Sequence, residues 1–224
     1  MQKKVLILLC SLFLFSSCFR IEETLILQND GSGFFGFKVD MSQSKYALRL
    51  AKNLSELYDG KSPDEQINRS FSRGLGAIEK TPGISSTQLI KNDDDFIYEL
   101  SLAFDDLKAL NTAVTQFFRE EDKTSGELFK FDKRKFERTG AIDIISMVER
   151  ESKNSKSKIS GLDPRVIFKD VTYSMKYVFD NKIKKYSNEA ASLSEDEKEL
   201  ELSYHVFDPE ESVTPENTIK LRRK

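Results

Sequence analysis

The sequence predicts an α+β domain, in which helices pack on one face of a mainly antiparallel sheet built from hairpins. Segments with period-two alternation come in neighbouring pairs joined by short polar turns, and segments with helical periodicity lie between the pairs. Such pairs favour antiparallel neighbours, whereas a parallel sheet needs strands and helices that alternate. We expect a leader over residues 1–17, one domain over 18–208 and a polar, flexible tail over 209–224.

The first hairpin is predicted from two apolar strands over residues 21–28 and 34–41, with an Asp-Gly turn at 29–33. Asp-Gly between apolar runs is typical of tight turns, because glycine tolerates the positive φ that the turn requires. Helical periodicity follows over 42–58. A second helix is expected to begin at Ser62, where serine can cap and the next residue, a proline, suits the first turn.

A second strand pair is predicted over residues 84–91 and 96–104. The later strand alternates large apolar and smaller or polar residues, which is typical of a strand with one buried face. Asp105 is expected to cap the helix that follows. The acidic run at 93–95 offers oxygen ligands for calcium, but it lacks the glycine and terminal glutamate of a calcium loop, so a polar turn is the preferred interpretation.

The second half of the chain has weaker patterns. A short hairpin or an exposed edge strand is predicted over 126–138, where charged side chains would protect the edge from pairing with other chains. Residues 141–148 are a short apolar segment, either a core helix or the lining of a ligand cavity. Residues 152–160 are expected to form a loop. A long strand over 166–183 is expected to pair with one that contains residues 200–206 and to close the sheet.

The leader has the layout of a secretory signal. Lys3 and Lys4 precede an apolar run over 5–15, and two small residues precede Cys18. The run is too short for a lasting membrane span, because a helix needs about 20 apolar residues to cross the hydrocarbon.

The leader ends in the residues Phe15-Ser16-Ser17-Cys18, which resemble the lipobox of bacterial lipoproteins. The resemblance implies cleavage between Ser17 and Cys18, a diacylglycerol on the Cys18 sulfur and acylation of the new amino terminus. An ordinary signal peptide with an incidental cysteine is the alternative. Two or three acyl chains would hold the protein almost permanently, because each buried CH2 contributes about 0.8 kcal/mol. The first predicted strand starts three residues after Cys18, so the domain would sit close to the lipid surface.

The order of elements gives a second resemblance. The lipobox cysteine, an immediate strand, the Asn29-Asp30-Gly31-Ser32-Gly33 turn, a second strand and helix, and a closing hairpin around Tyr173 to Phe179 together resemble the LppM-type family of bacterial lipoproteins. This resemblance implies an α+β domain that binds lipid or glycolipid. It assigns no binding residue to this chain.

Several activities lack the residues that they need. With His205 as the one histidine and Cys18 consumed by lipid, a His-rich zinc site or a Cys/His pair cannot be assembled. No nucleophile elbow, phosphate-binding loop or dinucleotide fingerprint occurs. Carboxylate pairs such as Glu22 with Glu23 leave a hydrolase as the weakest alternative. We therefore expect no catalytic residue, no metal and no cofactor, and the net charge of −2 does not suggest a nucleic-acid partner.

The expected function is that of an envelope lipoprotein, anchored to a membrane through Cys18, that binds an amphiphile or a protein partner without catalysis. A structural or assembly component of an envelope complex is the alternative. The sequence does not identify ligand-binding residues. The periplasmic face of the outer membrane is the expected location, with the inner membrane and the cell surface as alternatives. The terminal residues 222–224 are expected to belong to the tail instead of contacting anionic lipid.

Overall fold

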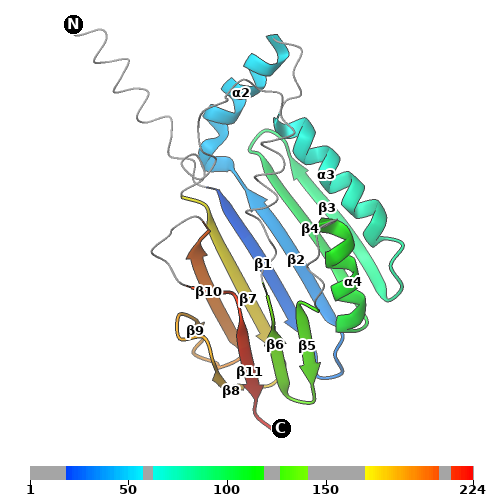
Figure 1. Cartoon of the computed structure of the whole chain (residues 1–224), viewed down its shortest axis with the longest axis vertical. Helices are drawn as coiled ribbons and strands as arrows, with labels where there is room; N and C mark the ends of the chain where they lie inside the picture. Colours follow the sequence, from blue (N-terminus) through cyan, green and yellow to red (C-terminus); the bar gives the residue numbers. More distant parts are fainter. Residues whose placement is uncertain (1–18, 58–62, 119–126, 141–169, 207–212, 224) are drawn as a thin grey trace, which may run out of the picture.

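The structure, a computed structural model, describes residues 19–57, 63–118, 127–140, 170–206 and 213–223 of the 224-residue chain. It confirms the predicted α+β class, with antiparallel strand pairs in the majority. The larger sheet has seven strands in the order β3-β4-β2-β1-β7-β10-β9 (Figure 1). Its strands are β1 (Arg20–Leu27), β2 (Gly33–Asp40), β3 (Ile84–Asn92), β4 (Ile97–Phe104), β7 (Thr172–Phe179), β9 (Ser192–Leu193) and β10 (Glu199–His205).

The predicted first hairpin is confirmed. Strands β1 and β2 pair antiparallel in one unbroken register, from Arg20 opposite Asp40 to Leu27 opposite Gly33. Gly31 in the turn has a φ of +91°, as the Asp-Gly signal predicted. Gly33 is required for another reason, because a Cβ there would lie 2.0 Å from the carbonyl oxygen of Ile26.

Strand β7 lies beside β1 and runs parallel to it, which the sequence did not predict. A parallel pair needs a long crossover connection, and here most of the chain separates the two strands. The predicted pairing of β7 with β10 is confirmed and is antiparallel. These strands do not close the sheet, however, since β9 pairs with the free side of β10.

A second sheet of four strands has the order β5-β6-β11-β8. Its strands are β5 (Phe129–Asp132), β6 (Lys135–Arg138), β8 (Ile183–Tyr186) and β11 (Asn217–Leu221). The predicted hairpin within 126–138 is confirmed as β5 and β6. Strand β11 lies inside the stretch predicted to be a flexible tail, so that prediction is wrong for residues 217–221. The predicted segments 141–148 and 152–160 lie outside the described residues.

Three α-helices are described: α2 (Lys45–Leu57), which follows the 3-10 turn η1 (Ser42–Ser44), α3 (Pro63–Ile78) and α4 (Leu107–Phe118). Asp106 caps α4, because its carboxylate accepts a hydrogen bond from the Ala109 amide at 2.7 Å; the predicted cap was Asp105. Among these helices, none has the length and apolar character that crossing a bilayer requires.

The core lies on one face of the seven-stranded sheet. Figure 1 shows helices α3 and α4 over one part of this face and the four-stranded sheet over another. Aromatic rings join the layers: Phe37 of β2 contacts Phe118 of α4, and Phe136 of β6 contacts Tyr177 of β7. Helices therefore cover one face, as predicted, but they share it with a second sheet.

Candidate functional site: a basic pocket at one end of the sheets

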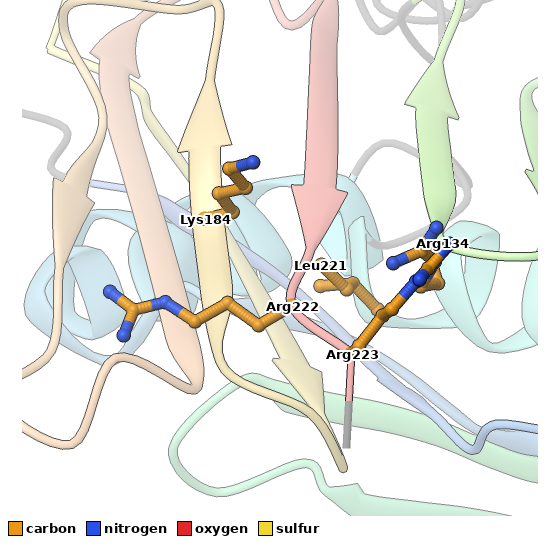
Figure 2. Close-up of a pocket in the computed structure, with 5 residues that line it drawn as sticks. All are labelled: Arg134, Lys184, Leu221, Arg222 and Arg223. Carbon is orange, nitrogen blue, oxygen red and sulfur yellow. The ribbon is translucent and has the colours of Figure 1, made fainter.

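Cationic side chains from three distant segments surround a hollow of about 610 Å³ at the end of β11. Arg134 comes from the turn between β5 and β6, Lys184 from β8, and Arg222 and Arg223 from the residues after β11. Figure 2 shows the Arg223 side chain directed toward Arg134, whereas that of Arg222 points away from it. We call this hollow the basic pocket; Leu221, which is buried, supplies its apolar lining.

Backbone hydrogen bonds hold the segments together. The Leu221 amide donates to the Arg134 carbonyl oxygen at 2.8 Å, and the Arg222 amide donates to that of Lys182, also at 2.8 Å. The β5–β6 turn is tight, with Lys133 at a φ of +55°. The main chain of Arg134 and Arg222 is thus held in place by bonds on the two sides of β11.

A β-bulge places Lys184. In the pairing of β8 with β11, Ile183 lies opposite Leu221 and Lys185 opposite Lys220, so Lys184 is the extra residue. Bulges change the direction of a side chain relative to the regular alternation, and they are common beside binding sites. Because of the bulge, the direction of the Lys184 side chain departs from the regular alternation of a strand. The side chain lines the basic pocket.

The basic pocket has an excess of positive charge, although the whole chain has a net charge of −2. One carboxylate, Glu197, lies near it, and two cations share this group: Arg222 at 2.8 Å and Lys182 at 3.2 Å. Arg134, Lys184 and Arg223 make no ion pair with the residues that the structure describes. Guanidinium groups match phosphate and carboxylate oxygens in geometry, so the arrangement is suited to an anionic ligand.

A second hollow, of about 760 Å³, lies beside β6 and β11 and has a largely polar lining. Asn217 organises it, because its side-chain oxygen accepts hydrogen bonds from the amides of Ser187 and Asn188 at 3.1 and 3.2 Å. The Asn217 amide nitrogen is buried and has no hydrogen-bond partner among the described residues. This hollow lacks the charge excess of the basic pocket, since Glu137, Glu189 and Glu216 line it.

A buried ion pair joins the two sheets. The Arg138 guanidinium lies 3.1 Å from the Glu23 carboxylate, both side chains have 0% exposure, and the Tyr173 hydroxyl donates to the same carboxylate at 2.6 Å. Burial alone would lower the pKa of Arg138, but the charge of Glu23 outweighs it and raises this pKa. Burial and then the charge of Glu23 raise the pKa of Tyr173. Sequence reasoning missed this pair, whose members are 115 residues apart.

The carboxylates considered for hydrolysis are not brought together. Glu22 and Glu23 are neighbours on β1, so their side chains point to opposite faces of the sheet. Glu22 lies 3.3 Å from Lys38 on the open face, and Glu23 faces Arg138 inside. His205 is exposed on the side of β10 away from Leu200, as predicted.

The acidic turn at 93–95 contacts helices α2 and α3. Asp95 lies 3.2 Å from Lys45, and the Asp94 carbonyl oxygen accepts a hydrogen bond from Arg49 at 2.8 Å. Asp93 accepts one from Asn68 at 3.0 Å. Within the described ranges, no group of three or more His, Cys, Asp or Glu side chains is placed to hold a metal ion.

The predicted lipidation and cleavage residues, Cys18 and Ser17, lie outside the described residues, which begin at Phe19. None of the basic-pocket residues was predicted to bind a ligand. Arg222 and Arg223 were assigned to a tail, and no local pattern connects them with Arg134 or Lys184. The available signal was the alternation of Ile219 and Leu221 with polar residues, which indicates a strand directly before the two arginines.

No protein-family model matches this sequence, and no curated protein is significantly similar to it. Among solved structures, the NMR structure of the folded domain of LppM from Mycobacterium tuberculosis is similar to this chain. The match covers 91% of this chain and 89% of that one, with a TM-score of 0.44 and 7% sequence identity.

Proposed function

We propose that the chain is an envelope lipoprotein, acylated on Cys18, whose folded domain binds a phosphate-bearing ligand in the basic pocket and catalyses no reaction. The observation that carries the binding function is the group Arg134, Lys184 and Arg223, cations without a carboxylate partner among the described residues. A phosphate group would supply the missing negative charge and accept several charge-assisted hydrogen bonds. The apolar lining at Leu221 suits the part of an amphiphile next to its headgroup.

The anchor is proposed from the lipobox and from the start of β1. Arg20, the first residue of β1, is two residues from Cys18 and can lie no more than about 7 Å from it. Acyl chains on Cys18 would hold this end of the sheet at the membrane. The basic pocket lies at the other end of the sheet, because β7 runs parallel to β1 and Lys182, whose carbonyl oxygen accepts a hydrogen bond from the Arg222 amide, lies three residues beyond the end of β7. A strand of eight residues rises about 23 Å from its first residue to its last. The ligand would therefore bind away from the anchoring bilayer.

Three observations support a binding role over catalysis. Glu22 and Glu23 lie on opposite faces of β1, so they cannot act on one substrate as an acid–base pair. His205 lies on β10, outside the group of residues that line the basic pocket. The basic pocket itself contains cations but no described carboxylate, cysteine or histidine that could act as a nucleophile or base.

An assembly role is the second candidate. It is favoured by two large apolar side chains on the open face of the seven-stranded sheet: Ile26 is 41% exposed and Phe34, its partner across the strands, 38%. Such a pair would suit contact with another envelope protein.

The anchor is tested by labelling cells that produce the protein with radioactive palmitate. We expect label in the native protein and none in Cys18→Ala. The variant should also keep its leader, and it should lack the acyl chains that make the native protein sediment with membranes. Equal labelling, or equal processing and sedimentation without label, would refute the lipoprotein assignment.

Binding is tested by calorimetry on the purified full-length mature protein. Inorganic phosphate and a short-chain phosphatidylglycerol are the two ligands, because they distinguish a free anion from a lipid headgroup. Replacing Arg134 and Arg223 by Gln should weaken binding about tenfold or more, which corresponds to about 1.4 kcal/mol.

The matched control replaces Lys80 and Lys108 by Gln. These lysines are exposed at or beside helices α3 and α4, and they change the net charge by the same amount. If both double variants lose affinity equally, the attraction comes from net charge and the basic pocket is not the site. If neither ligand binds the native protein, the phosphate proposal fails.

A further inference from the structure

Helix α2 presents an apolar face that the described part of the domain does not cover. Tyr46 is 72% exposed and Leu50 is 51% exposed, more than the exposed apolar side chains of the strands, such as Ile90 at 47%. They are four residues apart, so they lie one above the other on the helix. Asn53, one further turn along, is also exposed.

Flanking residues of α2, and Leu48 on its opposite side, fix the helix to the domain. The Lys45 ammonium lies 3.2 Å from Asp95, and Arg49 donates to the Asp94 carbonyl oxygen at 2.8 Å. Leu48 packs against the hydrophobic core. Because both polar contacts involve the β3–β4 turn, rotation of α2 that would bury Tyr46 and Leu50 is opposed by an ion pair, a hydrogen bond and apolar packing.

A chain of contacts places α2 at the anchored end of the sheet. Arg20 at the start of β1 lies opposite Asp40 in the hairpin, and its guanidinium is 3.1 Å from the Asp40 carboxylate. The same carboxylate accepts hydrogen bonds from the amide and hydroxyl of Ser42, at 3.0 and 2.6 Å, where η1 leads into α2. Figure 1 shows α2 at the end of the sheet where β1 begins, with the last described residues at the other end.

We propose that the Tyr46–Leu50 face of α2 rests on the bilayer that holds the lipidated Cys18. The inference rests on the proposed anchor, which leaves one residue, Phe19, between the acylated cysteine and β1. Tyrosine has an apolar ring and a polar hydroxyl and is enriched at membrane–water interfaces. Two apolar side chains would not recruit the protein by themselves. With the anchor supplying a high local concentration of lipid, they would set its orientation.

This orientation has a consequence for the basic pocket. If α2 and the start of β1 both touch the bilayer, the strands stand away from it, and Arg134 and Arg223 face outward from the membrane. The contact by α2 would thus keep the basic pocket accessible. It would prevent the open face of the seven-stranded sheet from resting on the bilayer.

The chain contains no tryptophan, so Tyr46→Trp introduces a single indole, which can be excited apart from the tyrosines. The lipidated full-length protein is reconstituted into phosphatidylcholine vesicles with or without lipids brominated near the headgroup. We expect the brominated lipids to reduce the fluorescence of the indole at position 46 about twofold or more. Phe34→Trp is the matched control, because this exposed apolar site lies at the other end of β2 and should keep its fluorescence.

The outcomes separate the two proposals. Quenching at position 46 alone supports the α2 contact, and adding Leu50→Asp should reduce it. Quenching at position 34 alone or equally at both positions would mean that the open sheet face lies on the membrane, which overturns the inference. No quenching at either position in protein that carries palmitate also overturns it while leaving the anchor intact. Failure to incorporate palmitate would instead refute the proposed function.

Discussion

Two arginines on one hairpin have opposite surroundings. Arg138 of β6 has no exposed side-chain surface; its guanidinium lies 3.1 Å from Glu23, and it stacks 4.4 Å from the centre of the Phe129 ring. Arg134, four residues earlier, lines the basic pocket and has no carboxylate partner among the described residues. The alternation along β6 turns Arg138 toward the seven-stranded sheet, while the tight turn leaves Arg134 at the surface.

The comparison shows why charge alone does not identify a binding residue. The attraction between Arg138 and Glu23 is offset by the loss of water around both charges, so the pair fixes how the two sheets meet more than it adds net stability. Arg134 stays hydrated and has no described carboxylate beside it, so its charge is available to a ligand. Burial and the presence of a partner therefore separate the structural arginine from the candidate binding arginine.

Arg138→Met should give the largest effect, because it removes the cation and leaves the Glu23 carboxylate buried. We expect the free energy of unfolding to fall by about 3–5 kcal/mol, measured by urea denaturation. Glu23→Leu combined with Arg138→Met removes both charges and should recover most of the loss. If the single variant loses less than about 1 kcal/mol, the carboxylate has found another partner and the ion pair does not join the sheets.

Raising the pH above about 10 should lower the free energy of unfolding through the buried tyrosines. Burial and the nearby carboxylate hold the pKa of Tyr173 well above its usual value. A raised pKa in the folded chain means that this contribution is complete below the unfolded pKa of about 10 and is lost as the pH rises above it. The free energy of unfolding should then fall by up to about 1.4 kcal/mol per pH unit for each such tyrosine.

Tyr204 offers an internal comparison, because burial raises its pKa to about 12. A spectroscopic titration of the folded protein should show one tyrosine with this midpoint while Tyr173 stays protonated. Tyr173→Phe should make the alkaline loss of stability shallower. An equal slope in that variant would contradict the assignment of the effect to Tyr173.

Asn111→Leu should loosen the hairpin that carries both arginines. Asn111 of α4 donates a hydrogen bond to the Phe129 carbonyl oxygen at 2.8 Å and accepts one from the Phe129 amide at 3.0 Å. The variant leaves both main-chain groups without these partners, which should cost about 1–3 kcal/mol. Hydrogen exchange at the Phe129 amide should accelerate, whereas exchange in the β1–β2 hairpin should change only with global stability.

The local elements of the fold could be predicted from the sequence. The Asp-Gly turn at Gly31 indicated the first hairpin, and helical spacing indicated α2 and α3, because each signal lies within a few neighbouring residues. The alternation in β4 was confirmed for Tyr98, Leu100 and Leu102, which are buried on one side, although Ser101 on the other side is buried too. Patterns of this kind report which face of an element is buried, but they do not report what covers it.

Contacts between distant segments could not be predicted in the same way. Strand β7 is as compatible with an antiparallel neighbour as with β1, so alternation did not indicate the parallel pair. Strand β11 was missed because its five residues lie in a polar stretch. The basic pocket needs the β5–β6 turn, the bulge at Lys184 and the end of β11 together, and none of these is visible in any one segment.

Arg134→Gln should give the smallest effect on stability and thereby sharpen the comparison with Arg138. The side chain is exposed and makes no ion pair with described residues, so the free energy of unfolding should change by less than about 0.5 kcal/mol. A small rise in stability is compatible with this reasoning, because the variant relieves repulsion from Arg223 and Lys184. Urea denaturation of Arg134→Gln beside Arg138→Met tests both expectations on one hairpin. A loss of several kcal/mol at Arg134 would show that its charge supports the fold, and the basic pocket would then lose its main argument for binding.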